Sequence, residues 1–138
     1  MADAPTELIA SVPMFSALAP KEVQQIARSF KQRVFSPGDV IAEEGKGGVG
    51  FFVIEDGTAK VTVRGEQRAT LGPGGYFGEV ALIDDGARTA TVTAETELRC
   101  YGITSWEFKP IVEMNPSIAW HMLQTLAKRL REAEQRAG

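Results

Sequence analysis

The most informative stretch of the chain is residues 76–92, YFGEVALIDDGARTATV. Gly78 permits close approach of the backbone, and residues 79–83 can form a short helix. The first N–H groups of such a helix have no partner within it and can bind an anion. Arg88 follows after a turn, and its planar guanidinium matches the oxygens of a phosphate group. This stretch therefore predicts an anion site.

The carboxylate of Glu79 restricts the chemical class of ligand that this site could bind. An ionised carboxylate only accepts hydrogen bonds and is repelled by phosphate. Glu79 must therefore face a donor such as a sugar hydroxyl, or else pair with Arg88. A helix start, an arginine and one carboxylate together suit a small phosphorylated sugar. In the alternative interpretation, Arg88 forms an ion pair with Glu79 or Asp85 that only stabilises the turn and binds no ligand.

The sequence around this stretch predicts short antiparallel strands. Apolar and polar residues alternate in residues 60–64, 90–94 and 98–103. Residues 51–54 are continuously apolar, which is typical of a strand buried on both faces. Turn signals separate these runs, as in Pro37-Gly38-Asp39, Asp56-Gly57, Arg64-Gly65-Glu66, Pro73-Gly74-Gly75 and Asp84-Asp85-Gly86. This spacing indicates a sandwich or barrel rather than a parallel sheet.

Helices are expected before the strands. Residues 7–18 are broken at Pro13 and predict two short helical pieces. Residues 20–30 predict a longer helix that begins with Pro20, because proline suits the first turn. Its apolar positions recur at helical spacing and form one stripe. They are Val23, Ile26, Ala27 and Phe30.

Two further helices are expected after the strands. Ser105 can cap a helix that runs to Met114, and Asn115 can cap another that begins at Pro116. The last helix carries a heptad-like seam, which either packs against the chain's own strands or pairs with a second copy. The seam consists of Ala119, Leu123, Leu126, Leu130 and Ala133.

Composition excludes several functional classes. The 138 residues suffice for one domain, and 15 basic against 18 acidic side chains give a net charge of −3, which argues against binding a phosphate backbone. Single residues Cys100 and His121 cannot form a disulfide or a zinc site. No basic segment precedes the first apolar residues, and residues 8–20 are too short to span a bilayer. We expect a cytoplasmic domain without a metal.

Several short motifs resemble those of enzymes, but the residues around them do not fit the structures that such motifs require. Residues 45–50, GKGGVG, match GxGxxG, but an apolar strand follows where a dinucleotide site needs a helix. Asp84-Asp85-Gly86 lacks the ligand spacing of a calcium loop. A metal-dependent jelly-roll enzyme of the cupin kind would need histidines on strands, and the one histidine lies in a predicted helix. We therefore expect no enzyme.

These motifs together resemble the cyclic-nucleotide-binding domain family, which includes catabolite activator protein and the regulatory subunit of protein kinase A. The family's phosphate-binding cassette reads Phe-Gly-Glu, several apolar residues, a short turn, and Arg followed by Ser, Thr or Ala and then Ala. Residues 77–79 and 88–90 match it at the family's usual separation of nine residues. Elements upstream match as well, namely residues 12–18, residues 35–41, Glu44-Gly45, Gly48 and the strand that ends at Gly57.

The resemblance implies one domain over residues 1–138 with an eight-stranded antiparallel jelly-roll-like barrel. Its parts are an N-terminal helical segment (1–32), the barrel (33–104) with the cassette (76–91), and C-terminal helices (105–138).

The resemblance also implies cAMP or cGMP as the ligand, with cAMP favoured. Arg88 would bind the cyclic phosphate and Glu79 the ribose 2′-OH. The implied ligand-binding set is Gly78, Glu79, Val80, Ala81, Arg88 and Thr89, with backbone N–H groups around Gly78, Ala81 and Thr89 completing the phosphate site. Thr89 resembles cGMP-preferring members but also occurs in cAMP binders. Ala87 departs from the family, which usually has proline there.

The implied function is a non-catalytic sensor that signals through movement of its C-terminal helix. It would act through an effector protein or an effector domain absent from this sequence, with a homodimer through the last helix as a further expectation. One alternative is a fragment of a catabolite-activator-type transcription regulator without its DNA-binding module. Another is a family member that has lost its ligand and acts as an interaction module. No direct binding to nucleic acid or membrane is expected.

Overall fold

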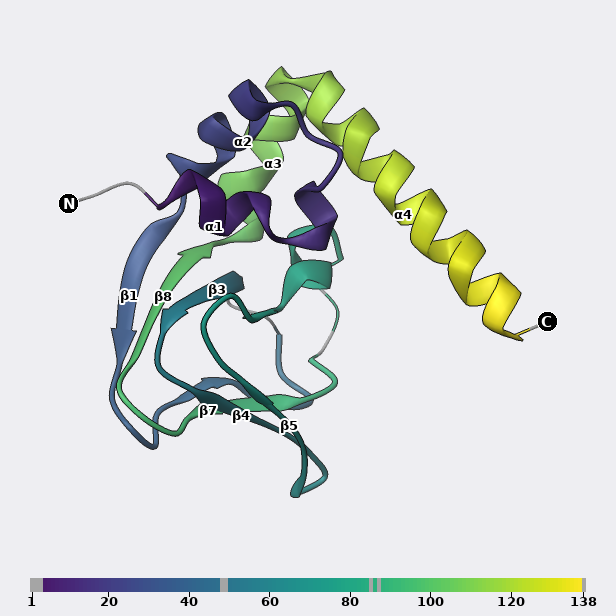
Figure 1. Cartoon of the computed structure of the whole chain (residues 1–138). Helices are drawn as coiled ribbons and strands as arrows, with labels where there is room; N and C mark the ends of the chain where they lie inside the picture. Colours follow the sequence, from purple (N-terminus) through teal and green to yellow (C-terminus); the bar gives the residue numbers. More distant parts are fainter. Residues whose placement is uncertain (1–3, 48–49, 85, 87, 138) are drawn as a thin grey trace.

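The computed structural model describes residues 4–47, 50–84, 86 and 88–137 (Figure 1). Its helices are α1 (Thr6–Ala10), the 3₁₀ helix η1 (Pro13–Phe15), α2 (Pro20–Ala27), the 3₁₀ helix η2 (Glu79–Leu82), α3 (Ser105–Met114) and α4 (Pro116–Ala137). Its strands are β1 (Lys31–Phe35), β2 (Val40–Ala42), β3 (Phe51–Asp56), β4 (Ala59–Val63), β5 (Glu66–Leu71), β6 (Tyr76–Phe77), β7 (Thr91–Ala94) and β8 (Leu98–Ile103).

The described strands form two four-stranded antiparallel sheets, which confirms the predicted β architecture. The strand orders are β1-β8-β3-β6 and β2-β7-β4-β5. Within the described ranges no ladder joins the two sheets, so the expected eight-stranded jelly-roll-like barrel is not found as one closed sheet. Strands β2 and β6 have only three and two residues and offer few backbone groups for such a joint.

Strand β3 is buried on both faces, as its apolar sequence predicts. Successive side chains of a strand point to opposite faces. Phe51 and Val53 join a cluster with the helices, and Phe52 and Ile54 join a second cluster between the sheets. Cys100 also lies between the sheets, and burial raises the pKa of its thiol to about 12. Strand β3 thus connects the helical layer to the sandwich.

The N-terminal helices follow the prediction except at one end. The break at Pro13 is confirmed, because α1 ends before it and η1 begins at it. Helix α2 begins at Pro20 as expected but ends at Ala27, short of residue 30. The N–H of Phe30 donates to the carbonyl of Ala27 at 3.2 Å, so the chain tightens there before strand β1 begins. Phe30 remains buried.

The caps of the C-terminal helices differ from the predicted ones. Thr104, not Ser105, caps α3: its hydroxyl accepts from the N–H of Glu107 at 3.2 Å, and the Glu107 carboxylate accepts from the N–H of Thr104 at 3.0 Å. This reciprocal pair needs Glu three residues after the cap, which only Thr104 provides. The side-chain amide of Asn115 donates to the Ile111 carbonyl at 2.8 Å. The Asn115 side chain therefore caps the C-terminal end of α3 rather than the start of α4.

Helix α4 is held at its start by Glu22 of α2. The Glu22 carboxylate accepts from the Ser117 hydroxyl at 2.7 Å and contacts Nδ1 of His121 at 2.8 Å. Burial would raise the pKa of Glu22, but the hydrogen bonds from Ser117, from the Ala19 N–H and from His121 outweigh it and lower that pKa. His121 therefore has a structural contact in this fold.

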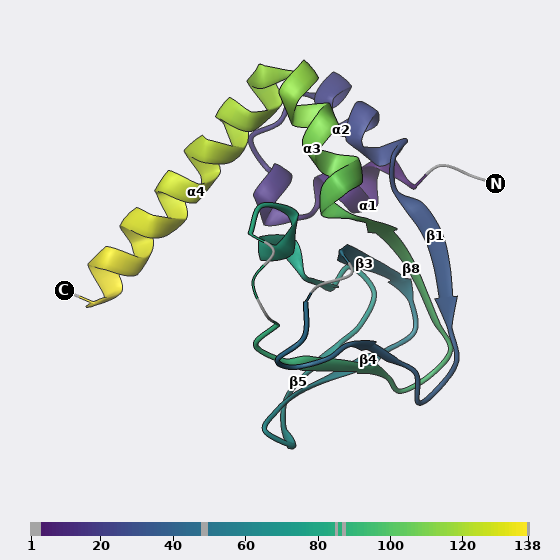
Figure 2. The same cartoon turned by 180° about the vertical axis from the view of Figure 1, so that it is seen from behind.

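One face of α4 packs on the domain and another is exposed. Ile118, Met122 and Thr125 are buried, while Leu123 and Leu130 of the heptad-like seam are 55% and 63% exposed. Packing against the chain's own strands therefore does not explain these two leucines. The helix projects outward to the side of the domain, and its C-terminal end stands clear of the other elements (Figures 1 and 2). Among the described residues, no helix has both the length and the apolar character that a bilayer crossing requires.

Candidate functional site

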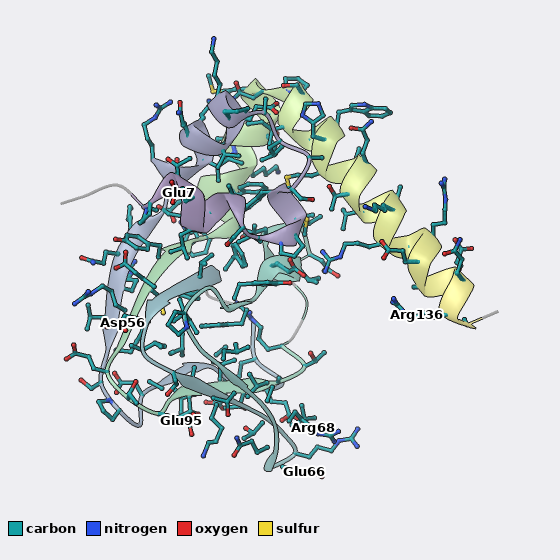
Figure 3. All side chains as sticks on the ribbon, in the orientation of Figure 1. Glu7, Asp56, Glu66, Arg68, Glu95 and Arg136 are labelled. Atoms are coloured by element: carbon teal, nitrogen blue, oxygen red, sulfur yellow. The ribbon has the colours of Figure 1, made fainter. Side chains whose placement is uncertain are left out.

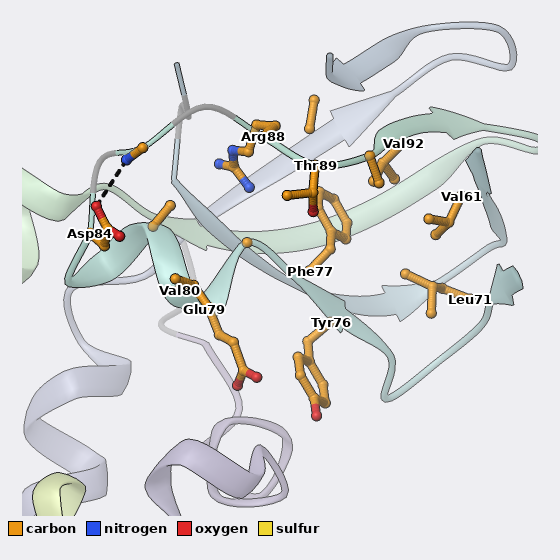
Figure 4. A pocket seen from close by; sticks show the side chains of 15 residues that line it. Val61, Leu71, Tyr76, Phe77, Glu79, Val80, Asp84, Arg88, Thr89 and Val92 are labelled. Atoms are coloured by element: carbon orange, nitrogen blue, oxygen red, sulfur yellow. Dashed lines mark hydrogen bonds between the residues drawn. The ribbon is translucent and has the colours of Figure 1, made fainter. Parts of the chain in front are cut away.

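A cavity of about 510 Å³ lies between the second sheet and helix η2 (Figure 4). Its charged side chains lie near η2 and in the segment before β7, and its apolar side chains come mostly from the strands. All six residues expected from the sequence line it: Gly78, Glu79, Val80, Ala81, Arg88 and Thr89. The fold thus brings this set together, and its binding of a ligand stays a prediction.

Gly78 precedes η2 in a conformation that favours glycine. Its φ is 84°, and an added Cβ would lie 2.4 Å from the Gly50 carbonyl oxygen and 2.5 Å from Nη1 of Arg88. The backbone therefore passes close to the guanidinium. The N–H of Ala81 already donates to the Gly78 carbonyl at 3.0 Å. The N–H groups of Glu79 and Val80 stand at the start of the helix, where an anion would meet them.

Arg88 is fixed to the loop between β2 and β3 by three hydrogen bonds. Its backbone N–H donates to the Lys46 carbonyl at 2.9 Å, and its carbonyl accepts from the Gly45 N–H at 2.8 Å. Its Nη2 donates to the Gly50 carbonyl at 2.6 Å. Burial lowers the pKa of the guanidinium, and Nε is shielded from solvent without a hydrogen-bond partner in the described structure.

The two oxygens of Glu79 have different surroundings. Oε1 accepts a hydrogen bond from Nη2 of Arg129 on α4 at 2.9 Å. Oε2 is buried and has no partner among the described residues. The ion pair between Glu79 and Arg88 that the sequence left open is not formed, and the Glu79 side chain points away from Arg88 in Figure 4. The other suggested partner, Asp85, lies outside the described residues.

Arg129 contacts the site residue Glu79, and the sequence analysis did not identify it. It lies 50 positions after Glu79 and belongs to no local motif. Its hydrogen bond to Glu79, aided by the carboxylate's charge, raises the pKa of Arg129. The sequence feature that could have indicated Arg129 is its position on α4. It follows the buried Thr125 by four residues and the buried Met122 by seven. That spacing places Arg129 on the packed face of the helix.

The described part of the site offers no metal centre. No group of three or more histidine, cysteine or carboxylate side chains lies together in the residues that the structure describes. The GxGxxG match is followed by strand β3, as predicted, and its Gly48 and Val49 lie outside the described residues. Ala87, the departure from the cassette pattern, also lies outside them.

Comparisons with known proteins converge on one family. The family model described as "Cyclic nucleotide-binding domain" matches residues 32–115. The mouse potassium/sodium hyperpolarization-activated cyclic nucleotide-gated channel 2 is 36% identical over 110 residues, which is 80% of this chain. The chain spans only 13% of that channel's length.

Two solved structures are similar in fold. The N-terminal domain of a transcriptional regulator from Streptomyces coelicolor A3(2) has a TM-score of 0.86 and 28% identity, over 93% of this chain and 95% of that one. Catabolite activator protein of Thermus thermophilus has a TM-score of 0.71 and 30% identity, over 91% of this chain and 62% of that one.

The contact between Gly78 and Arg88 can be tested by adding one methyl group. Gly78→Ala should destabilise the fold more than Gly74→Ala. Both glycines have φ near +85°, but an added Cβ meets nothing within 4 Å at Gly74. The control should lose about 1–2 kcal/mol, the cost of a left-handed alanine, and Gly78→Ala clearly more. Chemical denaturation measures both, and equal losses would contradict the close contact.

Proposed function

The chain belongs to the cyclic nucleotide-binding domain family, and we propose that it is a non-catalytic sensor that binds a 3′,5′-cyclic nucleotide in the cavity beside η2. We expect cAMP as the ligand, with cGMP as the alternative, and we expect the domain to act in the cytoplasm. The signal would pass through α4 to an effector protein or domain.

The observation that carries this proposal is a pair of buried polar atoms without partners. Nε of Arg88 and Oε2 of Glu79 are both shielded from solvent, and both residues line the same cavity. A buried donor or acceptor atom that lacks a partner costs free energy, which a suitable ligand group can recover. A phosphate suits the guanidinium and a hydroxyl suits the carboxylate. A cyclic nucleotide carries both groups close together on one ribose.

The remaining residues of the set have roles that follow from their positions. Gly78 lets the phosphate approach the backbone, and the N–H groups of Glu79 and Val80 face it at the start of η2. Ala81 adds little through its N–H, which is already donated to Gly78. Thr89 follows Arg88 with an exposed side chain on the cavity wall and can offer its hydroxyl.

Helix α4 is coupled to the ligand through Glu79. Arg129 occupies Oε1 and leaves Oε2 for the ribose hydroxyl, so one carboxylate can serve the helix and the ligand together. Docked α4 and bound ligand therefore favour the same orientation of Glu79. By thermodynamic linkage, ligand binding should therefore strengthen the docking of α4, and docking of α4 should increase the affinity for the ligand. The anchor at Glu22 keeps the start of α4 in place while its later turns respond.

A dimer through α4 is a further part of the proposal. Leu123 and Leu130 are exposed on the heptad-like seam, and Leu126 between them is half-buried against the domain. A second copy could cover the exposed leucines by pairing along the same helix. Such a dimer would suit either a free sensor or a piece of a transcription regulator related to catabolite activator protein.

Ligand binding should stabilise the fold through Arg88. With cAMP at 100 times its dissociation constant, binding adds about 2.7 kcal/mol, which should raise the melting temperature by roughly 5–10 °C. Thermal denaturation with cAMP, cGMP and AMP measures the shift in wild type and in Arg88→Ala. We expect a shift with a cyclic nucleotide, none with AMP, and none in the variant. No shift with either cyclic nucleotide would favour an interaction module.

Coupling to α4 should depend on Arg129. Arg129→Ala should weaken binding of the cyclic nucleotide about tenfold, because Glu79 loses the hydrogen bond that orients it. Hydrogen exchange should also show less protection of residues 125–137 by the ligand. The matched control is Arg131→Ala, because Arg131 is exposed on the same helix and has no ion pair in the described part of the chain. Unchanged affinity in Arg129→Ala would contradict the coupling.

The dimer should depend on the two exposed leucines. Light scattering should give a dimer mass for wild type and a monomer mass for the double variant Leu123→Glu, Leu130→Glu, because two buried charges oppose pairing. The control Gln124→Glu, Lys128→Glu changes exposed positions outside the seam and should stay dimeric. A wild-type monomer at high concentration, with and without ligand, would rule this interface out.

A further inference from the structure

We propose that the groove between η2 and α3 binds a segment of a partner protein that places a large apolar side chain in the groove and a carboxylate beside it. This groove is separate from the cavity that the proposed function assigns to the nucleotide, because the two share no lining residue. The inference therefore goes beyond the proposed function and does not require that a nucleotide is bound.

The groove lies where the end of η2 contacts helix α3, and its volume of about 490 Å³ is typical of pockets that enclose a bound group. Leu82 of η2 and Phe108 of α3 form its floor, and only 5% and 2% of their surfaces are exposed. Both belong to the core cluster beneath the helices, and the half-buried Val112 packs against that cluster. Because the floor is part of the core, the groove is already formed before a partner binds.

The rim of the groove exposes large apolar side chains. Trp106 of α3 is 69% exposed, and Ile83 at the end of η2 is 59% exposed. Single exposed apolar residues are common on protein surfaces, but these two border one apolar groove. Tryptophan is also enriched among the residues that contribute most to protein–protein binding. A protein segment can cover the rim as well as the floor, which favours a protein partner over a small metabolite.

The polar side chains of the groove supply hydrogen-bond donors and one positive charge. The ammonium of Lys109 and the indole N–H of Trp106 only donate, and the hydroxyl of Ser105 can donate. In the residues that the structure describes, Lys109 forms no ion pair and no carboxylate lines the groove. The partner must therefore bring acceptors, and a carboxylate best suits the charge of Lys109.

The carboxylates near the groove leave the charge of Lys109 available. Glu107 of α3 forms its ion pair with Lys31, at 3.0 Å. Asp84 lines the first cavity instead of the groove. Glu113 is one helical turn after Lys109, but no ion pair joins the two in the described part of the chain. An acidic segment is thus complementary to this surface, whereas a basic one would be repelled.

Selection of random short peptides by display on the full chain tests this inference. The selected peptides should combine Trp, Phe or Leu with Asp or Glu, and a synthetic peptide of their consensus sequence should bind. Trp106→Ala and Lys109→Glu should each weaken that peptide about tenfold, because one removes apolar contact and the other reverses the charge. The matched controls Trp120→Ala and Lys128→Glu change exposed residues of α4 and should leave the affinity unchanged. Arg136→Glu, at the C-terminal end of α4, is a further charge control (Figure 3).

Several results would overturn the inference. Selection of basic peptides, or of no peptide at all, would contradict the preference for an acidic, apolar segment. Loss of peptide binding in Arg88→Ala but not in Trp106→Ala would place the peptide in the first cavity. A dimer mass in light scattering that becomes a monomer mass in both Trp106→Ala and Lys109→Glu would assign the groove to a second copy of the chain. The proposed function is tested separately, by the shift of the melting temperature with cAMP.

Discussion

The arrangement of the site depends on the contacts of the Glu79 carboxylate. One oxygen is held by Arg129 of α4, and the other is buried without a partner. A buried carboxylate with one free oxygen keeps a demand for a donor that solvent cannot meet. The fold therefore holds the helix through this side chain, and under the proposed function the same side chain would also bind the ribose hydroxyl. Arg88 completes the arrangement from the opposite wall, where three hydrogen bonds tie it to the loop before β3.

Most of the fold and the residues that line the cavity were predictable because their signals are local. The break at Pro13, the doubly buried strand β3 and the cassette in residues 76–92 each depend on neighbours in the sequence. The exact cap of α3 was also local, but it required weighing Thr104 with Glu107 rather than reading Ser105 alone. The arrangement of the strands as two separate sheets depends on ladders between distant segments, and the sequence pattern carries no record of them.

Arg129 shows where sequence reasoning ends. Its partner lies 50 positions earlier, and nothing at either position indicates the other. The docking angle of α4 creates the contact, and that angle follows from packing of Ile118, Met122 and Thr125 and from the anchor at Glu22. The positions of side chains within one sequence motif could be predicted from the sequence. A contact between two elements that are distant in the sequence could be identified only from the three-dimensional structure.

The crowding around the Gly50 carbonyl has a consequence for how this sequence can change. That oxygen accepts from Arg88, and it would also meet a Cβ at position 78. Gly50 itself has no room, because its own Cβ would lie 2.6 Å from the Ile103 carbonyl oxygen. Substitutions at Gly50, Gly78 and Arg88 should therefore be strongly epistatic. In evolution these three positions are expected to be retained or replaced as a set.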